Sequence, residues 1–368
     1  EPGYGKLRIP YLNGGLFEED EEKKQQLDFP EEYFEKLFTF FDQYNFTVYE
    51  DSPDEHTVAV DPEMLGHIFE NLLEDNKQNG TFYTPKEVVH YMCCQSLIKY
   101  LYGRLNPDEK KEYVERDKIE RFVLNHETAG IIQYDEQILQ ALKEVKICDP
   151  AIGSGAFPMG LLMEIFHLVE ILYEDSQDVT IRVLKLKDKP WEENRAAVKL
   201  NIIQNCIYGV DLERGAVDIA RLRFWLSLVV DEEKPTPLPN LDYKIVVGDS
   251  LLSRFEGEVI NIDWDIKTKN ASAVKHIIAD QQVKFKQLEK LQHSYFAALG
   301  EKDKERLQKE IKDLKIDILI NQLELSKIQF AENHKPQPVL EGFKSEKDEQ
   351  EEVKNEAAVL KPCVYKIR

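Results

Sequence analysis

The sequence predicts an α/β fold in which a parallel sheet follows a helical region and precedes a helical hairpin. Three observations support this prediction. Short apolar runs at 145–149, 206–211 and 241–249 each end in an acidic residue, and segments of helical periodicity separate them. A Gly-Ser-Gly turn joins the first run to an apolar segment of helical spacing that begins near Met159. Two long stripes of apolar residues at helical spacing occupy 271–333.

The composition is that of a soluble globular protein. Of the 368 residues, 42% are hydrophobic and 32% are charged, with a net charge of −21. Phosphate contacts need Lys and Arg, so this acidic chain is not expected to grip DNA well by itself. No apolar run of membrane-spanning length and no signal-peptide pattern is evident, so no membrane contact is expected.

The cysteines predict no metal site. The five are odd in number and form no metal-ligand pairs, and adjacent Cys93 and Cys94 favour helix packing over redox chemistry. A reducing cytoplasm is the simplest setting for the protein. Because the chain begins at Glu1 without a methionine, inside what looks like a motif, we expect a fragment of a longer protein.

The N-terminal region is expected to be mainly helical. An amphipathic helix is predicted from Asp61, and another begins at Thr84, where Glu87 completes a capping box. Helical spacing also predicts a buried face made by Phe34, Leu37, Phe38 and Phe41.

The glycine turn has the features of a nucleotide-type ligand site. Asp-Pro-Ala-Ile-Gly-Ser-Gly-Ala-Phe occupies 149–157, at the end of a predicted strand and before a predicted helix. The glycines allow the backbone to approach a ligand closely, and the helix start presents free N–H groups. Such a strand–turn–helix unit is typical of doubly wound folds.

Acidic residues end the second and third strands. A carboxylate at Asp211, at the tip of the second strand, can accept both hydroxyls of a ribose. Asp249, in Gly-Asp-Ser-Leu, can accept an adenine amino group. The glycine turn and Asp211 are much further apart than the roughly 20 residues of a dinucleotide-binding fold, which argues against an NAD enzyme.

Together these elements resemble the S-adenosylmethionine-dependent DNA methyltransferases that modify amino nitrogens. Residues 149–157 resemble motif I of that family, Asp211 resembles motif II and Asp249 resembles motif III. Gly-Thr-Phe-Tyr-Thr-Pro at 80–85 resembles motif X, which meets the methionine part of the cofactor. Pro-Tyr-Leu-Asn-Gly-Gly-Leu-Phe at 10–17 resembles a segment of large single-chain restriction–modification enzymes.

The resemblance implies a partial Rossmann-like methyltransferase core from an adenine-N6 DNA methyltransferase, most like the single-chain type IIG restriction–modification enzymes. It implies a mainly helical region over 1–140 that includes motif X, and a cofactor-binding core over 141–265. An antiparallel helical hairpin over 266–335 and a charged, partly mobile tail over 336–368 would follow.

The implied cofactor is S-adenosylmethionine, and no metal is implied. Its binding residues would be Phe82, Tyr83, Thr84, Pro85, Asp149, Pro150, Ala151, Gly153, Ser154, Gly155, Ala156, Phe157, Asp211, Leu212, Asp249, Ser250 and Leu251. The family's catalytic Asn/Asp-Pro-Pro-aromatic element is absent from the sequence, and motif order would place it just beyond Arg368. No catalytic residue is therefore assigned, the fragment alone is expected to be inactive, and DNA would be bound through other parts of the full protein.

Other interpretations remain open at this stage. The same motifs occur in phage-exclusion methyltransferases without a nuclease, and they do not distinguish DNA from RNA or protein acceptors. The hairpin could bind a specificity subunit or a second copy, although a solvated structural hairpin is favoured. A dinucleotide oxidoreductase ranks last.

Overall fold

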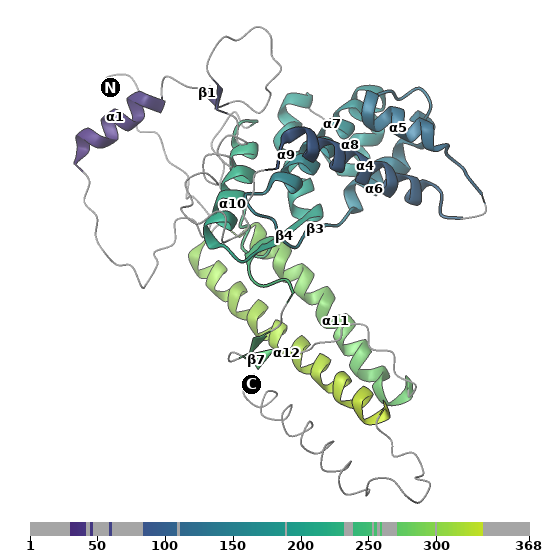
Figure 1. Ribbon diagram of the computed structural model, residues 1–368, viewed down its shortest axis with the longest axis vertical. Helices are drawn as coiled ribbons and strands as arrows, with labels where there is room; N and C mark the ends of the chain where they lie inside the picture. Colours follow the sequence, from purple (N-terminus) through teal and green to yellow (C-terminus); the bar gives the residue numbers. More distant parts are fainter. Residues whose placement is uncertain are drawn as a thin grey trace, which may run out of the picture. The chain divides into compact units, whose positions relative to one another are not determined.

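The computed structural model consists of two compact units, Glu1–Gly248 and Asp249–Arg368, and each is considered by itself (Figure 1). The structure describes residues 30–41, 45–46, 59–60, 84–108, 111–187, 190–231, 238–251, 254–255, 258–259, 271–298 and 300–333. The predicted helix from Asp61 lies outside these residues, as do Phe82 and Tyr83.

The described part of the first unit is rich in helix. Its elements in chain order are α1 (Glu31–Phe41), β1 (Asn45–Phe46), β2 (Ala59–Val60), α4 (Lys86–Leu105), α5 (Arg116–Asn125), η3 (Ile132–Tyr134), α6 (Asp135–Glu144), β3 (Ile147–Asp149), α7 (Ala156–Asp175), α8 (Gln177–Leu184), α9 (Trp191–Cys206), β4 (Ile207–Asp211), α10 (Arg214–Val229) and β5 (Ile245–Val247).

A small parallel sheet lies at the centre of this arrangement. Its strand order is β3-β4-β5, with Ile147 paired to Ile207 and Gly209 paired to Ile245. Parallel strands need long crossover connections. Helices α7, α8 and α9 supply the first crossover, and α10 supplies the second. This helix-rich arrangement around a parallel sheet agrees with the predicted α/β class.

Two glycines bring neighbouring elements together. A Cβ atom on Gly209 of β4 would lie 2.2 Å from Cδ1 of Ile152, in the loop after β3. A Cβ atom on Gly160 of α7 would lie 2.6 Å from Cγ1 of Val89 and 3.1 Å from Sγ of Cys93, both on α4. Packing at these two points therefore requires residues without side chains.

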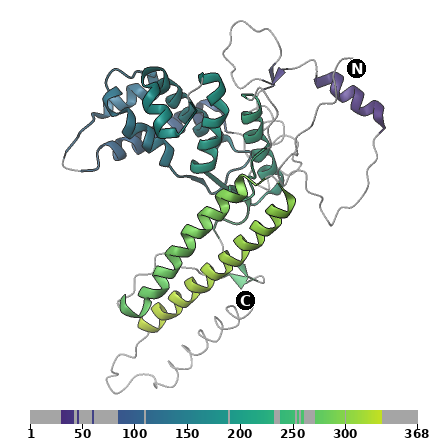
Figure 2. The same cartoon turned by 180° about the vertical axis from the view of Figure 1, so that it is seen from behind.

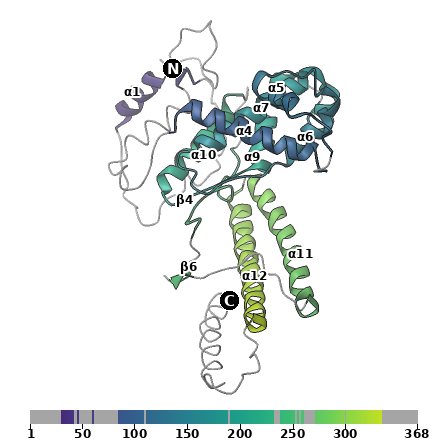
Figure 3. The ribbon, with the colours of Figure 1, turned by 45° about the vertical axis from the view of Figure 1, so that its right-hand side comes forward.

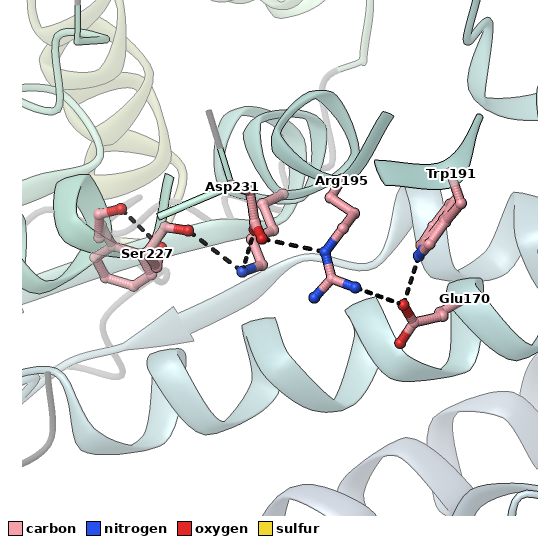
Figure 4. A network of polar contacts seen from close by, with 7 residues as sticks. Glu170, Trp191, Arg195, Ser227 and Asp231 are labelled. Atoms are coloured by element: carbon pink, nitrogen blue, oxygen red, sulfur yellow. Dashed lines mark hydrogen bonds and ion pairs between the residues drawn. The ribbon is translucent and has the colours of Figure 1, made fainter. Parts of the chain in front are cut away.

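A buried polar network connects α7, α9 and α10 (Figure 4). Arg195 of α9 lies 3.0 Å from the Glu170 carboxylate and 3.1 Å from that of Asp231. Lys199, fully buried, lies 2.5 Å from Asp231, and its Nζ also donates to the Ser227 carbonyl oxygen. Burial lowers the pKa of Lys199, while Asp231 acts in the opposite direction. Removing one partner of such a network leaves a buried charge uncompensated, which makes the network a strong constraint on the packing of the three helices.

Helix α7 is the central helix of the unit. Contrary to the expectation from sequence, its 20 residues are long and apolar enough to cross a membrane, and it is the single such helix among the described residues. Half of that apolar stretch is buried inside the protein, and α7 contacts α4, α8, α9 and the sheet. The composition of α7 is therefore explained by its position in the core.

Two local predictions differ from the structure. Thr84 does not cap α4, because Pro85 occupies the N-cap position and no side chain there bonds to the helix backbone. The face of α1 predicted to be buried is exposed, with Phe34 at 46% and Phe38 at 61% of their full exposure. Periodicity identifies an apolar face, but it does not specify which element covers that face.

The second unit contains a long helical pair. Helix α11 (Ala271–Phe296) packs along α12 (Glu301–Asn333), as Figures 2 and 3 show, and β6 (Arg254–Phe255) pairs with β7 (Glu258–Val259). Asn321 donates to the Asp280 carboxylate at 2.8 Å, and Gln281 donates to the Gln322 side-chain oxygen at 2.6 Å. Directional bonds between buried or half-buried side chains fix the register of the two helices more strictly than apolar contacts do.

The contact between Gly209 and Ile152 leads to a stability prediction. Gly209→Ala should lower the free energy of unfolding by about 1–3 kcal/mol, because the new methyl group overlaps Ile152. Gly248→Ala is the matched control, since its Cβ would lie 3.6 Å from Val210, and it should cost less than about 0.5 kcal/mol. Urea unfolding of both variants measures the difference, and equal stabilities would contradict the packing argument.

Candidate functional site

The candidate site is built on the carboxyl edge of the parallel sheet. Asp149 ends β3 and Asp211 ends β4, and the loop from Pro150 to Gly155 connects β3 to α7. Because the strands are parallel, their carboxyl ends meet at one edge. A direct bond from the Ile152 amide to the Val210 carbonyl, 2.9 Å long, holds the loop against β4.

The Asp211 carboxylate is the central acceptor of this edge. Its Oδ2 accepts a hydrogen bond from the Gly153 amide at 2.8 Å, and its Oδ1 accepts one from the Glu213 amide at 2.9 Å. The backbone carbonyl of Asp211 accepts a third, from the Gly248 amide at 2.8 Å. One residue therefore connects the glycine turn, the start of α10 and the end of β5.

The glycine turn has a backbone that requires glycine. Gly153 has a φ of 53° and Gly155 a φ of 91°, and both values lie in the left-handed region. Gly155 occupies the N-cap position of α7, which then begins at Ala156. A Cβ on Gly155 would lie 3.2 Å from that of Ala220 on α10, whereas a Cβ on Gly153 would meet nothing within 4 Å.

Two arginines of α10 support the edge from beneath, and the sequence analysis did not identify them. Nη1 of Arg223, which is only 4% exposed, donates to the Ser154 carbonyl at 2.8 Å. Nη2 of Arg221 donates to the Ile245 carbonyl at 2.7 Å, and Nη1 lies 3.3 Å from Asp242. Two arginines within an otherwise apolar helix are the signal that could have revealed them, because buried charges are paired.

The Asp149 carboxyl group is electrostatically unusual. It is partly buried, and its Oδ1 accepts a hydrogen bond from the Ala151 amide at 3.0 Å. Burial raises its pKa, the Ala151 bond acts in the opposite direction, and the nearby Asp211 carboxylate raises it further. A cationic group bound beside Asp149 would relieve both effects that raise the pKa.

A cavity of about 180 Å³ lies next to Asp149. It joins the tip of β3 and the start of α7 to one face of α4. Its walls are Met92, Cys93, Ser96, Ile147, Cys148, Asp149, Pro150, Phe157, Pro158 and Leu161. Three residues of the predicted site, Asp149, Pro150 and Phe157, therefore line one cavity together with the helix that follows Thr84 and Pro85.

The remaining predicted residues are distributed as follows. Thr84 is half-buried and Pro85 is exposed, directly before α4. Leu212 is exposed at the tip of β4. In the second unit Asp249, Ser250 and Leu251 are exposed, and the Asp249 carboxylate accepts a hydrogen bond from the Leu251 amide at 2.9 Å.

These features define a class: an α/β protein with a nucleotide-type site at the carboxyl edge of a parallel sheet. Comparisons with known proteins are more specific. Residues 205–354 match the family described as Eco57I restriction-modification methylase. A candidate type II restriction enzyme and methyltransferase of Methanocaldococcus jannaschii is 30% identical over 269 residues, which cover 66% of this chain and 21% of that protein. These findings confirm the predicted resemblance to methyltransferases of restriction–modification systems.

A second relative shares only a short segment with the chain. A 25S rRNA (adenine-N(1))-methyltransferase of Chaetomium thermophilum is 76% identical over 34 residues, which are 9% of this chain and 5% of that protein. No solved structure matches the chain. The chain spans about a fifth of the length of the Methanocaldococcus relative.

The two turn glycines should respond differently to substitution. Gly153→Ala should lower the free energy of unfolding by about 1–2 kcal/mol, the cost of a left-handed backbone. Gly155→Ala should cost roughly 1 kcal/mol more, because its methyl group also presses on Ala220. Gly153→Asn is the control for backbone strain, since asparagine adopts this conformation readily and should fall between glycine and alanine. A smaller loss for Gly155→Ala than for Gly153→Ala would refute the assignment.

Asp149 should make the protein less stable as the pH rises. Its folded-state pKa is raised, so the folded state holds the proton more tightly than the unfolded chain does. The stability linked to this proton is present below about pH 4, the ordinary pKa of aspartate, and is lost as the pH rises through the folded-state pKa.

Asp149→Asn removes this titration, and asparagine can still accept the hydrogen bond from Ala151. The variant should match the wild type in acid and be more stable near neutral pH. Thermal unfolding across this pH range gives the comparison, with the exposed Asp178→Asn as a control that should follow the wild type. A variant that is less stable at every pH would show that the carboxylate is not strained.

Proposed function

We propose that the chain holds the S-adenosylmethionine-binding pocket of a DNA methyltransferase that modifies adenine N6. The full protein would be a single-chain type IIG restriction–modification enzyme. The observation that carries the proposal is the Asp211 carboxylate, hydrogen-bonded to the Gly153 amide at the tip of β4. This bond joins the acidic strand end to the glycine turn, and both belong to the motifs that resemble the family.

The edge of the sheet fits the nucleoside part of the cofactor. A carboxylate offers about four acceptor positions, and backbone amides occupy one on each Asp211 oxygen. Acceptor capacity therefore remains for the two ribose hydroxyls. The space beside Gly153 is open, so a ligand can approach the backbone there. The exposed Leu212 would pack on the adenine, and Asp249 would accept its amino group.

The other end of the proposed pocket fits the amino-acid part. S-adenosylmethionine carries an ammonium group and a sulfonium group, both cationic. The partly buried Asp149 carboxylate would face the ammonium group, which would lower its raised pKa. The cavity beside Asp149 is walled by α4, and the motif that resembles motif X, with Thr84 and Pro85, precedes this helix.

The cofactor would supply the methyl group, and the residues of this chain would bind and orient it. Methyl transfer to an amino nitrogen depends on alignment of the reacting atoms more than on acid–base groups. The 368 residues contain no Asn/Asp-Pro-Pro-aromatic sequence. We therefore assign cofactor binding to this chain, and target-base chemistry and DNA contacts to other parts of the enzyme. The acidic net charge of −21 is consistent with this division.

The comparisons favour DNA over RNA as the substrate of the full enzyme. The match to the restriction–modification methylase family covers residues 205–354, and the Methanocaldococcus relative aligns over 269 residues. The relative named for rRNA aligns over only 34 residues.

Calorimetric titration with S-adenosylmethionine tests the proposal, with NAD as the control ligand. The wild-type chain should bind the methyl donor saturably and should not bind NAD. Asp211→Ala should weaken binding about 10–100-fold, because it removes a charged hydrogen-bond acceptor worth roughly 1.5–3 kcal/mol. Asp178→Ala, an exposed aspartate on α8, should bind as the wild type does.

Unfolding curves of Asp211→Ala will separate a binding loss from a folding loss. A folded Asp211→Ala variant with wild-type affinity would refute the ribose assignment. Saturable binding of NAD without binding of the methyl donor would overturn the proposed cofactor.

A further inference from the structure

Helices α4 and α7 contact each other closely beside the cavity, and this contact brings three metal-ligand side chains together. His90 and Cys94 lie one helical turn apart on α4, and Glu164 faces them from α7. The close approach of the two helices depends on Gly160, whose missing side chain leaves room for Val89 and Cys93. Among the described residues, this is the one group of His, Cys, Asp and Glu side chains with geometry suited to a metal ion.

The three ligand atoms form a compact triangle. All lie within 4.8 Å of one another. Sγ of Cys94 lies 3.7 Å from Nδ1 and 3.8 Å from Nε2 of His90, and Nδ1 lies 2.6 Å from the Glu164 carboxylate. Tetrahedral zinc, with bonds of about 2.0–2.3 Å, places neighbouring nitrogen, oxygen and sulfur ligands roughly 3.4–3.6 Å apart.

We propose that His90, Cys94 and Glu164 bind a zinc ion that links α4 to α7. A thiolate, an imidazole and a carboxylate together suit Zn²⁺, whereas Mg²⁺ and Ca²⁺ select sets of oxygen ligands. The histidine-to-sulfur distances already fit this geometry, and only the contact between His90 and Glu164 must lengthen to admit the ion.

The exposure of the three side chains determines how the ion is held. Cys94 is fully buried and the Glu164 side chain is 13% exposed, so two ligands are fixed by the packing of the helices. The His90 side chain is 58% exposed and can rotate to open the site. The fourth position would face solvent beside His90 and would hold a water molecule.

Binding must displace the thiol proton. Without a metal, burial and the nearby Glu164 carboxylate raise the pKa of Cys94 to about 12, so the thiol is protonated. Zinc binding by a cysteine is always coupled to loss of this proton, and a site with a neutral imidazole and one carboxylate still carries enough negative charge to compensate Zn²⁺.

The ion would act as a clamp between two parts of the first unit. Residue 93, next to Cys94, lines the cavity, and its Sγ lies 3.6 Å from the Phe157 carbonyl at the start of α7. A bond from α4 to α7 through zinc would therefore hold the helix after Pro85 against the helix after the glycine turn. The site rests on its own side chains and not on the proposed cofactor.

The test uses the untagged chain, reduced and freed of metal with EDTA, and titrated with Zn²⁺ and with Co²⁺ in excess Mg²⁺. The magnesium occupies weak sites made by surface carboxylates. The wild type should bind one equivalent of zinc, and the cobalt form should show the charge-transfer absorption of a cobalt–thiolate bond. Zinc should also raise the melting temperature.

The variants identify the ligands. His90→Ala changes an exposed side chain, so it should fold, and it should lose more than the ~10–100-fold in affinity that an outer-shell partner costs. Glu164→Gln should behave similarly, and Cys94→Ser should abolish the cobalt–thiolate absorption. His276→Ala, an exposed histidine of α11, is the matched control and should bind as the wild type does.

Two results would overturn the proposal. One is zinc affinity that does not change between the wild type and a folded His90→Ala variant. The other is a cobalt spectrum without thiolate absorption in the wild type.

Discussion

The geometry of the site depends on one carboxylate. Asp211 accepts hydrogen bonds from the Gly153 and Glu213 amides through its side chain and from Gly248 through its backbone. These bonds connect the turn after β3, the start of α10 and the end of β5. The left-handed conformation of Gly153 directs its amide toward Asp211, so the acid and the glycine each require the other. The edge of the sheet is consequently organised before any ligand binds.

This organisation gives the candidate binding residues structural roles as well. Asp211 positions the turn that it is proposed to share with a ribose, and Ser154 supplies a carbonyl that anchors Arg223. Asp149 and Asp211 raise each other's cost of ionisation at a partly buried edge. Two carboxylates held close together without a counterion store unfavourable energy, which a cationic ligand can release. Preorganisation of this kind reduces the ordering that binding would otherwise require.

The sequence predicted the features that depend on local pattern. The strands before Asp149 and Asp211 follow from apolar runs, and the start of α7 follows from Gly155. It could not predict features that depend on distant partners. Arg223 reaches a carbonyl 69 residues away, and the histidine at 90 reaches Glu164 across 74 residues. The wrong capping assignment at Thr84 has a local cause, because the following proline takes the N-cap position.

The contact between α4 and α7 connects the cavity with the proposed zinc site. At Gly160 the two helices approach too closely to admit a side chain, and cavity and ligand residues lie within one turn on either side. Cys93 faces the cavity while Cys94 faces Glu164, so adjacent residues on one helix serve two neighbouring sites. A rotation of α4 that opened one site would necessarily move the other, because a helix in a close-packed interface turns as a unit. The adjacent cysteines, which resembled ordinary packing residues in the sequence, thus mark the position where the two sites are mechanically coupled.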